Sequence, residues 1–272
     1  MNSTSLNLGS MEKSAHAEEI CAVLSTYERA FGCTPAVLIE CGARDSLETV
    51  LFSELNSKCR IYSFECNPAT LPVCRERTSR LANVELIEKA VSDNDGTVSF
   101  FATDPEKTET TWDNGNPGAS SLLRANPAYP LEKYVQNEIV VATTRLDTFM
   151  TQKGLQDISV IWMDIQGAEL MALKGLGNRI HSIGLIYLET EFFEIYKGQP
   201  LFRDIKKFLN HHGFQLYGFT HFGQYAGDAI FLNKKKIRPA IRFHMLFSDP
   251  FSYFHRRLKR KLSGYVARFF KR

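Results

Sequence analysis

Residues 36–68 read AVLIECGARDSLETVLFSELNSKCRIYSFECNP. Two short apolar runs in this stretch, Ala36–Cys41 and Arg60–Glu65, are typical of buried parallel strands. Between them, Asp45 and Glu48 have the spacing of a capping box, and a helical apolar stripe follows. The stretch therefore predicts a strand–helix–strand unit with a nucleotide-binding crevice at the ends of its strands.

The turn after the first strand indicates which nucleotide fits. A dinucleotide site needs several glycines so that the backbone can approach a pyrophosphate. This turn has one, Gly42, and it also contains Glu40 and Asp45. Because carboxylates suit a ligand with an ammonium and a sulfonium group, the turn favours S-adenosylmethionine over NAD. Glu65, at the end of the second strand, is then placed to bind two ribose hydroxyls. An ordinary strand-to-helix turn remains the alternative.

Strand-like and helix-like segments alternate along the chain of 272 residues. The alternation predicts one α/β domain with a doubly wound sheet over residues 34–233. A polar segment and a helix (1–33) precede it, with residues 1–10 disordered and the helix beginning at Met11. A basic tail (234–272) follows. Further strands are expected at 84–91, 97–102, 138–144, 158–164, 182–189, 214–219 and 228–232, and a loop over 104–136 is expected to form a lid.

Composition places the protein in the cytoplasm. No apolar run approaches the roughly 20 residues that span a bilayer, and the N-terminus lacks the pattern of a signal peptide. The six cysteines show no metal-type spacing and are expected to be reduced. From Lys234 onward the chain has thirteen Lys and Arg residues against one acid, so the rest of the chain is acidic.

Nine short motifs occur in order between Ala36 and Leu232. Together they resemble the FkbM family of S-adenosylmethionine-dependent methyltransferases. The resemblance implies the class I methyltransferase fold, a Rossmann-like sheet of seven strands whose last strand is antiparallel. It also implies methylation of hydroxyl oxygens, often on sugars or polyketide-type metabolites. The motifs are VLIECGARD, YSFECNP, EKAVSDNDGTVSF, SSLL, TTRLDTF, MDIQGAELMALKG, LETEFFEIYKGQPLF, HHGF and GDAIF.

Two residues depart from the family pattern, which often has Asn at the position of Arg44 and usually Gly at that of Ser46. A side chain at 46 is expected to crowd the methionine end of the cofactor, and Arg44 brings a charge to the crevice. The remaining cofactor-binding candidates match, and two groups of site residues follow. The cofactor-binding candidates are Glu40, Gly42, Ala43, Glu65, Val91, Ser92 and Asp164, and the acceptor-side candidates are Ser120, Ser121, Tyr196 and Gln199.

A hydroxyl is a poor nucleophile unless a base removes its proton or a metal lowers its pKa. Asp164 and Glu189 end strands that are expected to be neighbours, so they are candidates for the base or for two ligands of Mg²⁺. Asp164 could instead cap a helix or anchor the cofactor's ammonium group. Glu189 could instead form a salt bridge to Lys174 or Arg203. His221, expected in the loop before the last strand, is an alternative base.

Residues 251–272 have the pattern of a basic amphipathic helix, which predicts peripheral contact with the inner face of the membrane. Its apolar stripe could equally pack on this domain or on a second copy in a homodimer. A nucleic-acid partner is not expected, because the acidic body would repel phosphate.

These observations predict a cytoplasmic S-adenosylmethionine-dependent O-methyltransferase. The expected acceptor is a sugar hydroxyl of a glycan or glycan precursor. The alternatives are a polyketide-type small-molecule acceptor, a non-catalytic module that binds the cofactor and is tethered to membrane, and an NAD(P)-dependent enzyme.

Overall fold

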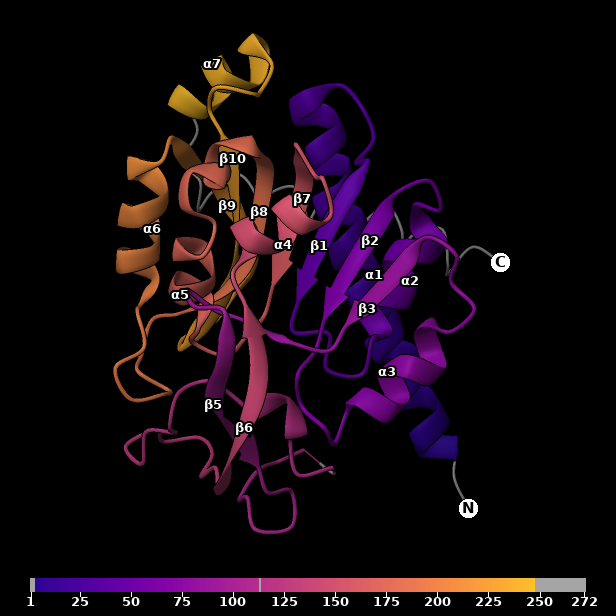
Figure 1. Cartoon of the computed structure of the whole chain (residues 1–272), viewed down its shortest axis with the longest axis vertical. Helices are drawn as coiled ribbons and strands as arrows, with labels where there is room; N and C mark the ends of the chain where they lie inside the picture. The colour runs from indigo at the N-terminus through magenta and orange to yellow at the C-terminus, as the bar shows by residue number, and fades with distance from the viewer. Residues whose placement is uncertain (1–2, 113, 248–272) are drawn as a thin grey trace.

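A computed structural model describes residues 3–112 and 114–247 (Figure 1). Its main sheet has seven strands in the order β3-β2-β1-β7-β8-β10-β9. Neighbouring strands run parallel except β10, which is antiparallel to both β8 and β9. The expected doubly wound sheet with an antiparallel last strand is therefore confirmed. The strands are β1 (Val37–Cys41), β2 (Arg60–Phe64), β3 (Val84–Ile87), β7 (Ile158–Met163), β8 (Ile183–Glu191), β9 (Phe214–Phe222) and β10 (Ala226–Asn233).

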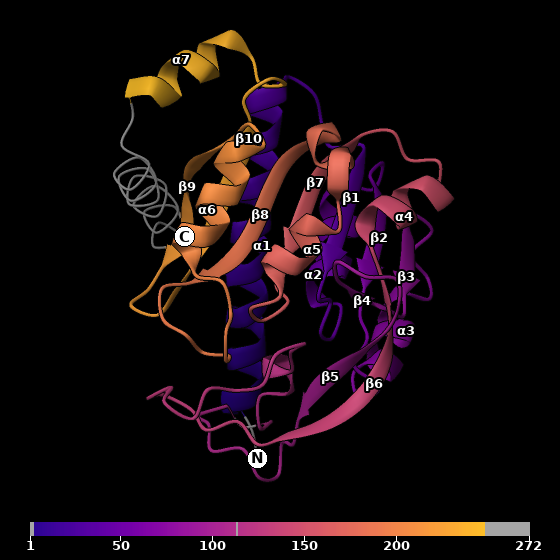
Figure 2. The same ribbon diagram turned by 60° about the vertical axis from the view of Figure 1, so that its left-hand side comes forward.

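Helices cover both faces of this sheet (Figures 1 and 2). Apolar residues of α1 and α2 pack in one core with one face, and apolar residues of α4, α5 and α6 pack in a second core with the other face. The helices are α1 (Ser3–Phe31), α2 (Leu47–Leu55), α3 (Leu71–Thr78), α4 (Leu146–Gln152), α5 (Glu169–Lys174), α6 (Phe202–His211) and α7 (Pro239–Phe247), with short 3₁₀ helices at Pro117–Ala119 and Gly177–Ser182.

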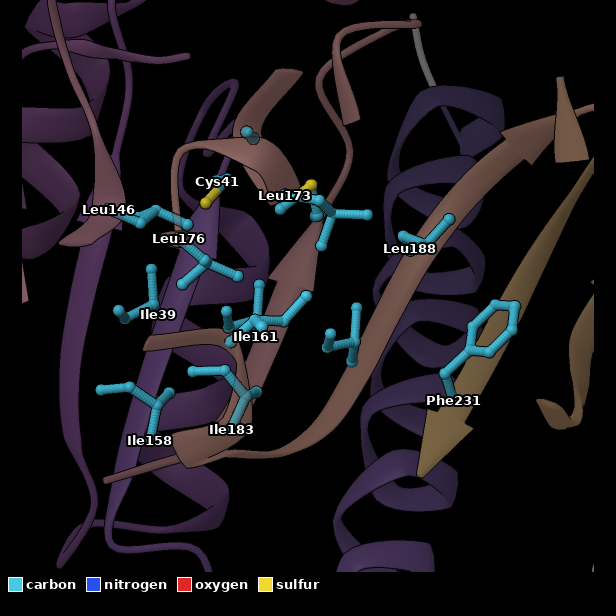
Figure 3. Packing of buried hydrophobic residues seen from close by; sticks show 14 of the residues in the cluster. Ile39, Cys41, Leu146, Ile158, Ile161, Leu173, Leu176, Ile183, Leu188 and Phe231 are labelled. Carbon is cyan, nitrogen blue, oxygen red and sulfur yellow. The ribbon is translucent and has the colours of Figure 1, made fainter. Parts of the chain in front are cut away.

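Alternate residues of the central strands enter the two cores. Ile39 and Ile161 pack on the α5 side, where Figure 3 shows them among Leu173, Leu176 and other apolar side chains. Leu38 belongs to the core on the α1 side. Because both faces are buried, the strands read as continuous apolar runs, which is why the sequence revealed them.

A second, smaller sheet has the order β4-β6-β5, formed by β4 (Ala90–Val91), β5 (Gly96–Thr103) and β6 (Gln136–Thr144). Strands β5 and β6, expected at 97–102 and 138–144, pair antiparallel. The single strand expected over 84–91 is wrong, because the chain leaves the main sheet after Ile87 and β4 pairs with β6 instead.

Residues 104–135, called the insertion from here on, join β5 to β6 at the end of the molecule that carries the smaller sheet (Figure 2). Isolated bridges tie this region to the body, pairing Phe101 with Ser121 and Ala125 with Tyr196. A third bridge joins Glu109 to Lys133 within the insertion. Backbone bridges therefore hold the expected loop at defined points. The cavity described below shows which surface the loop covers.

Two expectations concern the ends of the chain. Helix α1 begins at Ser3 rather than at Met11, so the disorder expected for residues 1–10 is wrong for the part that the structure describes. The amphipathic helix predicted over 251–272 lies outside the described residues. Across 3–112 and 114–247, no helix is both long enough and apolar enough to cross a membrane.

Candidate active site

A cavity lies at the carboxyl ends of β1, β2 and β7, between the main sheet and the insertion. The non-atom space at this site, open solvent included, is about 650 Å³. Pro117, Gly118, Ser120 and Leu122 line it, so the insertion covers one side, as a lid would. The predicted site residues that line the cavity are Gly42, Glu65, Val91, Ser120 and Asp164.

Gly42 forms the floor of this cavity. Its φ is 88°, and a Cβ at this position would lie 1.9 Å from the carbonyl oxygen of Asp164. Any side chain is therefore excluded, for both conformational and steric reasons. The N–H groups of Gly42 and Ala43 both donate to the carbonyl of Phe64, at 3.0 and 2.9 Å. Ala43 is itself buried at 1% exposure, so it supports the floor without lining the cavity.

Glu65 is anchored by three backbone N–H groups. Its Oε2 accepts from Arg44 at 2.7 Å, and its Oε1 accepts from Cys66 at 2.8 Å and from Asn67 at 2.7 Å. Burial raises the pKa of Glu65, and these hydrogen bonds oppose the shift. A carboxylate has about four acceptor positions, so the anchored group keeps capacity for a hydroxyl of a ligand.

Glu40 lies below the cavity rather than on its wall. It is 1% exposed, and its Oε2 accepts from Thr49 Oγ1 at 2.5 Å and from Ser63 Oγ at 2.7 Å. Burial raises the pKa of Glu40 to about 8. The carboxyl group therefore ties β1, β2 and α2 together, and its contact with the cofactor stays a prediction.

The turn between β1 and α2 contains two non-glycine residues with left-handed backbone, Arg44 at φ 52° and Ser46 at φ 60°. Ser46 is fully buried beside Cys74 and does not line the cavity, so its expected crowding of the cofactor is wrong. Helix α2 has Ser46 as its N-cap residue, and the Asp45 carboxylate accepts from Leu47 N–H at 3.2 Å. The expected capping box is also wrong, because Glu48 pairs with His16 at 2.8 Å.

Asp164 and Glu189 meet where β7 and β8 end, because Met163 is paired with Leu188 in the sheet. The two carboxyl groups hydrogen-bond each other. Gln166 Nε2 donates to both, at 2.7 Å to Asp164 Oδ1 and 2.8 Å to Glu189 Oε2. These contacts occupy Glu189 in place of the alternative salt bridge. The helix-capping alternative for Asp164 is wrong, since α5 has Ala168 as its N-cap.

One proton shared within this pair accounts for its charges. Burial and the negative charges of Asp164, Glu191 and Asp228 raise the pKa of Glu189 well above its ordinary value. Desolvation by the surrounding protein also raises the pKa of Asp164, although its side chain is exposed to the cavity, and hydrogen bonds from Gln166 and Glu189 oppose that shift. We therefore place the proton on Glu189 and the negative charge on Asp164, the member that lines the cavity.

Gln166, which the sequence analysis did not single out, fixes the geometry of this pair. It lies in a left-handed conformation at φ 54°, in a turn where Glu169 Oε1 accepts from the N–H groups of Ile165 (3.0 Å) and Gly167 (3.3 Å). The Tyr196 hydroxyl lies 2.8 Å from Gln166 Oε1 and 2.9 Å from the carbonyl oxygen of Ala119, so it is within hydrogen-bond distance of both. The signal in the sequence was a Gln-Gly pair directly after a strand that ends in an acid.

Three of the acceptor-side candidates, Ser121, Tyr196 and Gln199, hold Gln166 and the segments around it in place. Ser121 Oγ donates to the carbonyl of Gln166 at 2.7 Å, which fastens the insertion to the turn. Tyr196 is fully buried, and Gln199 Oε1 accepts its backbone N–H at 2.5 Å. These residues act on a ligand through Gln166, whereas Ser120 lines the cavity directly.

Two other candidates lie away from the cavity wall. Ser92 is fully buried, and its hydroxyl lies 2.8 Å from Thr143 Oγ1, which ties the end of β4 to β6. His221 belongs to β9 and not to a loop, so its predicted setting is wrong. Its Nδ1 is 3.7 Å from Asp228 Oδ2, and Asp228 is opposite Glu189 in the sheet. His221 is therefore separated from the acidic pair by one carboxyl group.

The expected magnesium site finds no support. Within residues 3–112 and 114–247, no three His, Cys, Asp or Glu side chains are grouped so that they could hold a metal ion. The Gln166 amide donates to both Asp164 and Glu189. Such a donor set stabilises a carboxylate by hydrogen bonds rather than by a cation.

Three aromatic rings lie beside the acidic pair. The ring centroids of Tyr129, Phe193 and Tyr225 are 5.9 to 6.4 Å apart. Burial, and after it the charges of Glu132, Glu189 and Glu191, raise the pKa of Tyr129. Phe193 is 37% exposed. The site thus combines flat apolar faces with carboxyl groups.

Comparison with known proteins assigns the family. Residues 40–216 match the FkbM methyltransferase domain. The chain belongs to the FkbM methyltransferase family. One similar protein is the 2-O-methyltransferase NoeI of Sinorhizobium fredii (strain NBRC 101917 / NGR234). It is 31% identical to this chain over 177 residues, which cover 64% of this chain and 70% of NoeI.

Solved structures resemble this FkbM-family chain more distantly. The precorrin-6y C5,15-methyltransferase of Geobacter metallireducens GS-15 is 16% identical with a TM-score of 0.42, over 79% of this chain and 87% of that one. TrmK of M. capricolum is 11% identical with a TM-score of 0.42, over 85% of this chain and 79% of that one. The family assignment does not depend on them.

As a family member, the protein is an S-adenosylmethionine-dependent methyltransferase. The cavity fits that cofactor. The Gly42 cradle admits a closely approaching ligand, Glu65 retains acceptor capacity for ribose, and the apolar Val91 and Phe100 line the wall nearby. The NAD-dependent and non-catalytic alternatives are therefore set aside.

Proposed function

We propose that this enzyme methylates a hydroxyl group on the sugar ring of a glycan or glycan precursor, with Asp164 as the general base. One observation carries the proposal: the Asp164 carboxyl lines the cavity, and the Gln166 amide donates to it and to the Glu189 carboxyl. We take Asp164 as the ionised member, because burial and neighbouring acids raise the pKa of Glu189 well above its ordinary value. A hydroxyl group needs such a base, because its own pKa is far above neutral pH.

S-adenosylmethionine, when bound, supplies a methyl group attached to a positively charged sulfur. Asp164 accepts the hydroxyl proton while the new O–C bond forms and the C–S bond breaks. Glu189 and Gln166 keep the charge on Asp164 and fix the direction of its oxygens, so the base is oriented before the acceptor arrives. General-base catalysis of this kind contributes about 10²- to 10⁴-fold to a rate.

One observation supports a sugar ring as the acceptor, and a second supports an oxygen as the methylated atom. A sugar ring has apolar C–H faces that stack on aromatic rings, and it has hydroxyls that hydrogen-bond to carboxylates. Tyr129, Phe193 and Tyr225 offer such rings beside Glu189. The relative NoeI is named a 2-O-methyltransferase, which agrees with methylation of an oxygen.

The test is a screen of acceptors with the purified protein and S-adenosylmethionine labelled in the methyl group. Oligosaccharides and lipid-linked glycan precursors form one set, and phenolic and polyketide-type hydroxyl compounds form the other. Transfer of label to an oxygen of the first set, located by mass spectrometry, supports the proposal. Transfer to the second set alone would overturn it and favour a small-metabolite acceptor.

A further inference from the structure

The turn between β7 and α5 carries Gln166, whose amide donates to both members of the acidic pair. Gln166 and Gly167 are consecutive left-handed residues, with φ values of 54° and 92°. This conformation is unfavourable for a residue with a Cβ, so it persists only where other contacts enforce it. The position of the Gln166 amide therefore depends on what holds this turn.

The carboxyl group of Glu169, the first residue of α5, binds the turn on both sides of Gln166. Its Oε1 accepts from the N–H of Ile165 at 3.0 Å and from the N–H of Gly167 at 3.3 Å. Glu169 is fully buried, and its Oε2 has no hydrogen-bond partner among the described residues. Because a buried carboxyl group is costly without hydrogen bonds, the two N–H groups of the turn account for an acid at this position.

The turn is also enclosed by neighbouring side chains. A Cβ added to Gly167 would lie 3.2 Å from Gln199 Cβ and 3.3 Å from Tyr196 Cδ2. In addition, Ser121 Oγ donates to the carbonyl of Gln166 at 2.7 Å. Of the side chains that contact the turn in this way, Glu169 is the one that accepts from its N–H groups.

We propose that Glu169 is a positioning residue, whose carboxyl group fixes the turn so that the Gln166 amide donates to both Asp164 and Glu189. Glu169 does not line the cavity, so it acts through Gln166. Its importance for the reaction rests on the proposed function, in which Asp164 is the general base.

The charge of Glu169 and its hydrogen bonds affect Asp164 in opposite directions. Removal of a nearby negative charge lowers the pKa of Asp164. Loss of the turn contacts misplaces the Gln166 amide, a donor that lowers this pKa, and therefore raises it. The sign of the change thus separates a positioning role from an electrostatic one. The other ionisable groups that act on Asp164 or Glu169 are Glu48, Glu189, Glu191 and Arg44, and all are kept in the variants below.

NMR titration of isotope-labelled aspartate carboxyl groups tests the proposal, with the Asp164 signal assigned by its loss in Asp164→Asn. Glu169→Gln keeps an acceptor oxygen and loses the charge, so the midpoint of the Asp164 titration should stay or move to lower pH. Glu169→Met loses both, and the midpoint should move to higher pH, by most of the shift that Gln166→Leu gives. A midpoint that is unchanged or lower in Glu169→Met would overturn the proposal.

A double variant tests whether Glu169 acts through Gln166. When Glu169→Met is combined with Gln166→Leu, there is no amide left to misplace, so the Asp164 midpoint should rise no further than in Gln166→Leu alone. A further rise would show that Glu169 acts on Asp164 by another route.

Two matched variants address folding. Leu173→Ala loosens the core side of the same helix and keeps both turn contacts, so it should lower the melting temperature and leave the Asp164 midpoint unchanged. A shift equal to that of Glu169→Met would instead assign the effect to general loosening. Gly167→Ala strains the turn at φ 92° with Glu169 in place and should raise the midpoint, even where Glu169→Met does not fold. An unchanged midpoint in Gly167→Ala would contradict the proposal.

These titrations need neither acceptor nor cofactor, so they test Glu169 independently of the proposed function. With an acceptor identified in the screen, the acidic limb of the kcat profile should shift in the same order across the variants. A shifted Asp164 midpoint with an unshifted limb would uphold the contacts of Glu169 and refute Asp164 as the base.

Discussion

At the scale of single residues, the environment makes two similar carboxyl groups different. Asp164 and Glu189 shift each other's pKa, and the negative charges of two further acids, Glu191 and Asp228, also raise the pKa of Glu189. Gln166 donates to both. The proton therefore belongs to Glu189, and the base is the member on the cavity wall.

Replacement of each member should separate these roles. Asp164→Asn removes the base and should lower kcat by about 10²- to 10⁴-fold. Glu189→Gln imitates a protonated carboxyl, so it should retain at least about a tenth of the activity. Initial rates with an acceptor identified in the screen measure both. Full activity in Asp164→Asn would show that the base is another residue.

The pH dependence of turnover should report the hydrogen bonds to Asp164. Activity needs its ionised form, so the rate rises with pH as Asp164 loses its proton. Gln166→Leu removes a donor that lowers the pKa of Asp164, and the acidic limb of the kcat profile should shift to higher pH. Tyr196→Phe keeps the amide and only frees its orientation, so a smaller shift is expected. An unchanged limb in Gln166→Leu would contradict the role given to Gln166.

Ser46 stores strain away from the chemistry. Its φ is 60° and its hydroxyl is buried in the protein interior. Ser46→Gly should therefore raise the free energy of unfolding by about 1 kcal/mol, as measured by urea denaturation. Ser46→Ala keeps the Cβ at the same φ and is the matched control, with a smaller gain. A loss of stability in Ser46→Gly would show that the hydroxyl matters more than the backbone.

At the scale of elements, a buried acid joins β1 to β2 and α2. Glu40 accepts hydrogen bonds from Ser63 on β2 and Thr49 on α2. The buried face of helix α2 differs from the apolar stripe that the sequence predicts. Leu51 and Phe52 are buried, whereas Leu55 is 45% exposed. The contacts of α2 with α1 and the sheet set this orientation, and a nine-residue helix has too few turns to specify it alone.

This acid should make the stability of the protein depend on pH. The pKa of Glu40 is about 8 in the fold and near 4.5 in the unfolded chain, so folding favours the protonated form. The free energy of unfolding should therefore fall as pH rises from about 5 to 8, by up to about 4 kcal/mol for this group. In Glu40→Gln most of this slope should vanish in urea denaturation series. The same slope in the variant would assign it to other acids, such as Glu169.

At the scale of the whole molecule, charge is divided between an acidic body and a basic C-terminal stretch. Within the described body, carboxyl groups gather at the strand ends that form the site, with Asp164, Glu189, Glu191 and Asp228 acting on one another electrostatically. We therefore expect the body to repel polyanions and the basic stretch to attract an anionic lipid surface.

Deletion of residues 251–272 should abolish binding to vesicles that contain anionic lipid. The wild-type protein should bind such vesicles in a salt-dependent manner and ignore neutral ones, since basic residues contribute about 1 kcal/mol each near an anionic surface. Vesicle co-sedimentation measures both proteins. Unchanged vesicle binding after the deletion would contradict the prediction that residues 251–272 mediate membrane contact.

The sequence predicted the central strands and three cavity residues, but it did not predict the break after Ile87 or the role of Gln166. The central strands were predicted because each is a buried apolar run, and Gly42, Glu65 and Asp164 were predicted because they follow such runs directly. The break after Ile87 was missed, because β4 leaves the main sheet to pair with β6, some fifty residues later in the chain. Gln166 was missed for a similar reason, because its role depends on Tyr196 and Ser121.

By itself, the sequence determined the α/β class, the strands of the main sheet and the acids that end them, since periodicity and turn residues act over short distances along the chain. Only the tertiary structure decided which carboxyl of the Asp164–Glu189 pair carries the proton, since that depends on burial and on charges from three strands. It also decided that Ser46 is interior and Arg44 faces the cavity. Side-chain direction and protonation follow from contacts between distant segments, which no local pattern encodes.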